Sequence, residues 1–165
     1  MNVEISEMVG MIGVFIVSLL FGSPPPGAGI ILLRDTDVGK QVLLVQNINT
    51  SRWSFTKGTH EPFDEDYRAN AVREVYEEAG FTENIDYTIY SGPCFYGKRP
   101  YWFGRAHSSN LPALLPLEHR DINWFTLTKP LSRPNKDVRA WISKGAPLLC
   151  EDEYKFECEN CHNEL

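Results

Sequence analysis

The segment from Gly58 to Phe81 constrains this chain most, because it places three glutamates within five residues and then ends at a glycine. If residues 66–79 form a helix, each residue turns it by about 100°. Glu74, Glu77 and Glu78 then share one arc of the helix. A second arc is apolar and consists of Ala71, Val72, Val75 and Ala79. We expect the apolar arc to pack on a sheet and the acidic arc to face outward.

Both ends of this predicted helix carry recognisable signals. Gly80 is a natural terminator, because glycine adopts the left-handed backbone conformation without a steric penalty. Asp64 and Asp66 supply carboxylates that can cap the first turn and interact favourably with its exposed N–H groups. The sequence therefore predicts a helix that starts after these aspartates and stops at Gly80.

The acidic arc needs a chemical explanation. Like charges at these spacings destabilise a helix by roughly 0.2–0.5 kcal/mol per pair. A bound divalent cation reverses that effect, and carboxylate oxygens are the ligands that Mg²⁺ and Mn²⁺ favour. The alternative interpretation is a solvated acidic face without a ligand.

The same segment resembles the Nudix box. The matching positions are Glu65, seven further residues, Arg73-Glu74-Val75, Glu77-Glu78 and Gly80-Phe81. The departure is six residues between Gly58 and Glu65 where the family has five. We place the extra residue, for which Phe63 is a candidate, in the loop before the helix, where insertions are tolerated.

This resemblance implies an α/β fold, the Nudix α/β/α sandwich around a mixed β-sheet, and an enzyme that hydrolyses a pyrophosphate linkage. It implies Mg²⁺ or Mn²⁺ as cofactor, held by Glu74, Glu77, Glu78 and the carbonyl of Gly58. It gives Arg73 and Glu65, with Gly80, a structural role in fixing the loop against the helix.

A second stretch, 117–127, resembles the late strand of many Nudix proteins. Glu118 lies six residues before Trp124, as does the general base of the decapping enzymes. The resemblance thus makes Glu118 the residue that takes the proton of the attacking water, with Glu74 as the rival. An exposed loop glutamate is the other interpretation of Glu118. His119 is expected at the surface.

Apolar and β-branched runs separated by turn residues predict strands at 28–34, 41–46, 87–96 and 99–107, and 53–58 leads into the box. The first two form a hairpin. Residues 134–144 predict a closing helix, with Val138, Trp141 and Ile142 as its buried stripe. In the strand 99–107, alternation places Tyr101 and Phe103 on one face and Trp102 on the other.

The entry to the box, Trp53 to Gly58, resembles dinucleoside-tetraphosphate hydrolases and mRNA-decapping enzymes, with Thr56 where these have proline. The residues that we expect to contact substrate phosphate or nucleobase are Lys57, Tyr96, Lys98, Arg99 and Tyr101. The preferred substrate is a small nucleotide, a dinucleoside polyphosphate. Capped RNA, a diphosphoinositol polyphosphate and a silent nucleotide-binding module are the alternatives.

The 165 residues suggest one domain, at 24–148, with flanking segments at 1–23 and 149–165. The apolar run 8–22 is shorter than the ~20 residues that span a bilayer, so a core segment and membrane association both remain open. The formal net charge of −6 argues against general nucleic-acid binding. The four cysteines are too few for a disulfide scaffold, which favours a cytoplasmic protein. Cys158, Cys161 and His162 have metal-ligand spacing, although an acidic tail without a site is the preferred interpretation.

Overall fold

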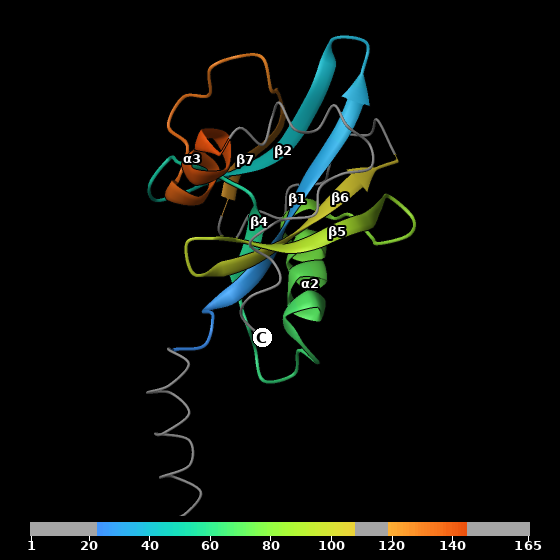
Figure 1. Cartoon of the computed structure of the whole chain (residues 1–165), viewed down its shortest axis with the longest axis vertical. Helices are drawn as coiled ribbons and strands as arrows, with labels where there is room; N and C mark the ends of the chain where they lie inside the picture. The colour runs from blue at the N-terminus through green and yellow to red at the C-terminus, as the bar shows by residue number, and fades with distance from the viewer. Residues whose placement is uncertain (1–22, 108–118, 145–165) are drawn as a thin grey trace, which may run out of the picture.

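The computed structural model describes residues 23–107 and 119–144, which form one mixed β-sheet with a helix on each face (Figure 1). This is the expected α/β/α sandwich. The elements are β1 (Gly27–Thr36), β2 (Gly39–Asn47), β3 (Trp53–Ser54), β4 (Thr56–Thr59), α2 (Tyr67–Ala79), β5 (Tyr87–Tyr96), β6 (Arg99–Ala106), β7 (His119–Thr126) and α3 (Lys136–Ser143).

Strand β1 is the centre of the seven-stranded sheet, whose main order is β3-β2-β1-β6-β5. It pairs antiparallel with β2 and β4 and parallel with β6, while β7 pairs antiparallel with β2. The residues from Ile30 to Leu33 form a continuous apolar run, and all of them are buried. Such a run is typical of a strand that is covered on both faces, as β1 is. The predicted β1–β2 hairpin is confirmed, and the predicted strands β5 and β6 pair antiparallel with each other.

Alternation along the strands creates two cores. On one face, Ile30 and Leu32 of β1 pack with Ala71 and Val75 of α2. On the other face, Ile31 and Leu33 of β1 pack with α3. This second core also includes Phe55, Tyr101, Phe103, Val138 and Trp141. Trp102 packs against the α2 core, so the predicted alternation in β6 is confirmed. Ile142 is an exception to the predicted stripe on α3, because it is 43% exposed.

Helix α2 starts and ends close to the predicted residues. The side chain of Asp66 caps it by accepting a hydrogen bond from the N–H of Ala69 at 2.7 Å. Gly80 ends it in the left-handed conformation, with φ of 69°. Asp64 does not cap the helix, because its carboxylate is bound to Arg73 instead.

The orientation expected for the acidic arc was wrong for two of its three members. Glu74 and Glu78 are buried, with exposed fractions of 8% and 7%, whereas Glu77 is exposed. The reason is that β4 and its following loop extend over this side of α2, so the side of the helix that carries Glu74 and Glu78 meets protein rather than water.

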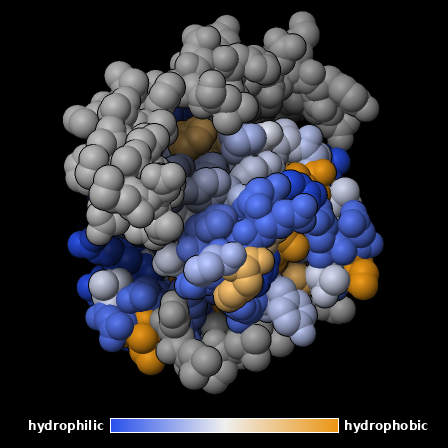
Figure 2. All heavy atoms as spheres, turned by 90° about the horizontal axis from the view of Figure 1, so that it is seen from below, coloured by the Kyte–Doolittle hydropathy of each residue, from blue (hydrophilic) through white to orange (hydrophobic). Residues whose placement is uncertain are grey.

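Within 23–107 and 119–144, no helix is long and apolar enough to cross a membrane. The apolar run 8–22, Glu118 and the trio Cys158, Cys161 and His162 lie outside the described residues. Seen from below, the described surface is mainly hydrophilic and its hydrophobic residues are scattered (Figure 2).

Candidate active site

Gly58 of β4 and Glu74 of α2 lie in direct contact. A Cβ atom added to Gly58 would stand 2.1 Å from the carboxyl carbon and from both carboxylate oxygens of Glu74. Only a residue without a side chain therefore allows the Glu74 carboxylate to rest on the backbone of β4. Glycine is required at this position by close approach, not by its own dihedral angles.

Glu78 lies one turn further along α2, and its two oxygens face different partners. Its Oε2 accepts a hydrogen bond from the backbone N–H of Lys57 at 3.0 Å. Its Oε1 lies 3.5 Å from Nε2 of His119, the first residue of β7. His119 is only 6% exposed, so the expectation of a surface histidine was wrong.

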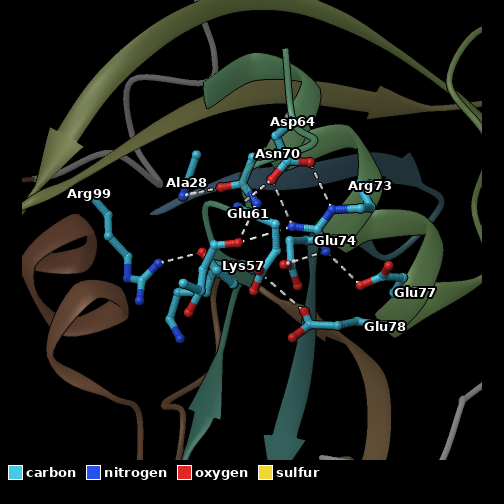
Figure 3. A network of polar contacts seen from close by, with 12 residues as sticks. Ala28, Lys57, Glu61, Asp64, Asn70, Arg73, Glu74, Glu77, Glu78 and Arg99 are labelled. Carbon is cyan, nitrogen blue, oxygen red and sulfur yellow. Dashed lines mark hydrogen bonds and ion pairs between the residues drawn. The ribbon is translucent and has the colours of Figure 1, made fainter. Parts of the chain in front are cut away.

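Arg73 connects the loop before α2 to the acidic residues (Figure 3). Its Nε and Nη2 donate to the two oxygens of Asp64 at 2.9 and 3.0 Å, and Nη2 also donates to the carbonyl of Thr59 at 3.0 Å. Its Nη1 lies 2.9 Å from Glu74 and 2.8 Å from Glu77. The hydrogen bond from Arg73 lowers the pKa of Asp64 to about 2, and the same contact raises the pKa of Arg73.

The structural role expected for Glu65 belongs to Asp64. Glu65 is exposed, and no hydrogen bond or ion pair of its side chain is found in the described part of the chain. Five residues, 59–63, separate Gly58 from Asp64, so the family spacing is restored when Asp64 is taken as the acidic position. The extra residue then lies between Asp64 and Arg73, at the start of the helix. This spacing was the signal that sequence reasoning missed.

Two side chains complete the end of the β1–β4 ladder. Nη1 of Arg99 donates to the carbonyl of Gly58 at 2.7 Å. From helix α2, Asn70 accepts from the N–H of Ala28 of β1 at 2.8 Å and donates to the carbonyl of Thr59 of β4 at 2.9 Å. Asn70 is fully buried and was not identified from the sequence, because nothing local distinguishes it from a surface asparagine.

The residues expected to contact substrate fall into three groups: two beside the acidic residues, one exposed in a turn and two in the core. Lys57 and Arg99 lie beside the acidic residues, and burial lowers the pKa of Lys57 against the opposing influence of Glu78. Lys98 is exposed in the turn between β5 and β6.

Tyr96 and Tyr101 are core residues, and their expected role in binding a base was wrong. They are 4% and 0% exposed, because alternation directs them toward α3. The hydroxyl of Tyr101 donates to Oδ2 of the buried Asp137 on α3 at 2.6 Å, and burial is the main cause that raises the pKa of Tyr101.

The donor set suits a hard divalent cation. Within the described ranges, no three His, Cys, Asp or Glu side chains already converge tightly enough to hold a metal ion. The oxygen-rich pair Glu74 and Glu78 nevertheless lies buried against β4, and the bare Cα of Gly58 leaves room for the carboxylate. Oxygen donors of this kind fit Mg²⁺ or Mn²⁺.

The mixed sheet between two helices, with Gly58 of β4 against Glu74 of α2, agrees with the fold and the motif of the Nudix hydrolases. The chain belongs to the Nudix family: the family's NUDIX domain matches residues 23–145.

Solved structures of the same fold include an Ap4A hydrolase from C. elegans, at 24% identity and a TM-score of 0.61, covering 74% of this chain and 97% of that one. They also include the Nudix hydrolase RenU from M. smegmatis, at 15% identity and a TM-score of 0.62, covering 78% and 88%. A third is an ADP-ribose pyrophosphatase from Streptococcus suis, at 19% identity and a TM-score of 0.55, covering 78% and 95%. At these identities the likeness concerns the fold alone. Comparison with curated proteins gave no match.

Proposed function

We propose that this protein hydrolyses a pyrophosphate linkage in a nucleoside diphosphate derivative, with a dinucleoside polyphosphate as the preferred substrate. One observation carries the proposal: two glutamates of α2 are buried against β4, where the backbone N–H of Lys57 binds Glu78 and the guanidinium of Arg99 binds the carbonyl of Gly58 next to Glu74. The side-chain charge of Lys57 lies close enough to interact with both glutamates. A site that joins acidic ligands to basic side chains suits a metal–phosphate substrate. The similarity of the fold to the C. elegans Ap4A hydrolase supports the choice of substrate.

The proposed metal ligands are Glu74, Glu77 and Glu78, together with the carbonyl of Gly58. When bound, Mg²⁺ or Mn²⁺ would offset the negative charge of the diphosphate and lower the pKa of a bound water. Glu77 is exposed and paired with Arg73, so it has to exchange part of that contact for the ion. The Gly58 carbonyl already accepts from Arg99, which brings a positive charge to the side of the site where phosphate oxygens would lie.

The other residues act by positioning. Arg73 binds Asp64 and the Thr59 carbonyl and thereby holds the loop 59–64 against α2, next to Glu74. The backbone of Lys57 fixes one oxygen of Glu78. The proton of the attacking water would go to Glu118 or to Glu74, and of these two only Glu74 lies within the described residues.

The test is a hydrolysis assay with Mg²⁺ or Mn²⁺ over a panel of diadenosine polyphosphates, ADP-ribose and other sugar nucleotides, capped RNA and diphosphoinositols. We expect a diadenosine polyphosphate to give the highest kcat/KM. Preference for capped RNA or a diphosphoinositol would overturn the substrate proposal. Nucleotide binding without turnover would favour a silent module.

Two variants test the ligands. Glu77→Gln and Glu78→Gln should nearly abolish turnover and leave the circular dichroism spectrum unchanged. Glu83→Gln is a charge-matched control, because Glu83 follows the end of α2 and pairs with Arg68 rather than with a residue of the site. Retained turnover in both ligand variants would reject the metal assignment.

A further inference from the structure

His119 reaches the acidic pair through an irregularity in the sheet. In the β2–β7 ladder Gln46 faces Asp121 and Asn47 faces His119, so one residue of β7 is skipped between them. Ile122 and Trp124 of β7 point toward the α2 core. Simple alternation would direct His119 to the opposite face, and a bulge of one residue reverses this. The irregularity therefore brings an imidazole to the side of the sheet that carries the site.

The separation between His119 and Glu78 is informative. Nε2 lies 3.5 Å from Oε1, which is longer than the 2.7–3.2 Å typical of an N–H···O hydrogen bond. Two ligands at right angles around one ion, each about 2.1 Å from it, are roughly 3 Å apart. Both side chains are more than nine-tenths buried, so the imidazole is held next to the carboxylate oxygen that faces away from Lys57.

We propose that His119 is an additional metal ligand, which gives the site one nitrogen donor among its oxygens. This inference rests on the proposed metal-dependent function. Mg²⁺ strongly favours oxygen ligands, whereas affinity for sites that contain imidazole rises along the first-row metals from Mn²⁺ onward. The site consequently selects Mn²⁺ or a later first-row divalent ion over Mg²⁺.

The direct test is pulsed electron paramagnetic resonance of Mn²⁺ bound to the full chain without substrate. We expect electron spin-echo modulation from a directly coordinated imidazole nitrogen, with the frequencies altered when the histidines carry ¹⁵N. Bound Mn²⁺ without nitrogen modulation would overturn the proposal, because a histidine that only supports Glu78 from outside gives no directly coordinated nitrogen.

The chain contains four histidines, so the signal has to be assigned. His119→Gln replaces the nitrogen donor by an amide oxygen and should remove the modulation. His107→Gln is the matched control, because His107 is exposed at the end of β6 and contacts Thr88 rather than the site. Modulation that persists in His119→Gln, or disappears in His107→Gln, would assign the nitrogen elsewhere and overturn the proposal.

Calorimetry supplies a second, independent measurement. In His119→Gln the ratio of Mn²⁺ to Mg²⁺ affinity should fall by about tenfold, the low end of the effects seen when groups around a metal are changed. An unchanged ratio would count against His119 as a ligand. A wild-type chain that binds neither ion would instead defeat the proposed function itself, so the two failures are distinguishable.

Discussion

Helices α2 and α3 both bury carboxylates against the sheet, from opposite faces and in contrasting surroundings. On α3, Asp137 is 2% exposed and accepts a 2.6 Å hydrogen bond from the hydroxyl of Tyr101. It lies in the first turn, where the helix favours negative charge. On α2, Glu74 and Glu78 are buried within one turn of each other, in contact with Arg73, with the backbone of Lys57 and with His119.

This difference separates two reasons for burying an acid. A neutral hydroxyl, a helix end and the charge of Lys57 nearby satisfy the single carboxylate of α3, so the fold itself accounts for its burial. A pair of like charges in partly desolvated surroundings is costly and gains most from a nearby cation of higher charge. Stability alone therefore accounts for the α3 acid, whereas the burial of the α2 pair agrees with the proposed ligand binding.

The largest effect should separate the two helices directly. Glu78→Gln should lower kcat by about 10³-fold, which corresponds to roughly 4 kcal/mol of transition-state stabilisation, with little loss of stability. Asp137→Asn should do the opposite, costing about 1–3 kcal/mol of unfolding free energy with kcat almost unchanged. Steady-state kinetics and urea unfolding of both variants measure this, and a stable but inactive Asp137→Asn would break the comparison.

The contact between Gly58 and Glu74 comes next in size. In Gly58→Ala the new methyl group would overlap the carboxylate, so Glu74 must move. Because a displacement near 1 Å can cost about 10² in rate, we expect turnover to fall by that order, together with Mn²⁺ affinity measured by calorimetry. Gly104→Ala is a matched control: its Cβ would stand 2.8 Å from Leu32 in the core, so it should reduce stability without weakening metal binding.

A smaller effect distinguishes the adjacent acids before α2. Asp64→Asn breaks the paired contact with Arg73 and should cost about 1–3 kcal/mol of unfolding free energy. Glu65→Gln should change stability by less than about 0.5 kcal/mol, because its side chain is exposed. Chemical denaturation of both variants is the measurement. A larger loss in Glu65→Gln would return the structural role to Glu65.

The smallest effect is the pH dependence of that same contact. The folded state lowers the pKa of Asp64 from 3.8 to about 2, so its contribution is complete above the unfolded pKa and is lost as pH falls through the folded one. The stability difference between wild type and Asp64→Asn should be constant above about pH 5 and shrink toward pH 2. Thermal melts across this range test it, and a gap that widens on acidification would contradict the assigned cause.

Local sequence signals were sufficient for the secondary structure. The apolar run of β1, the turn residues between the strands and Gly80 at the end of α2 each act within a few residues, so the elements could be predicted. The motif also identified which helix carries the acidic residues.

The partners across the fold could not be predicted, because they depend on how distant segments meet. Asp64 replaces Glu65 through the path of a loop, and His119 turns inward through an irregular strand pairing. From the sequence, Tyr101 resembles an aromatic residue that binds a base, but in the structure its hydroxyl donates to Asp137, 36 positions away. Such contacts leave no periodic trace in a single sequence.

The central position of β1 has a consequence for how the molecule matures. Strand β4, strand β6 and helix α2 come from separate stretches of the chain, and all of them assemble on β1. Contacts between remote stretches form late because chain entropy opposes them. A nascent chain that still lacks β6 and β7 therefore cannot complete the sheet around β1, and the contact between His119 and Glu78 forms only after synthesis has reached β7.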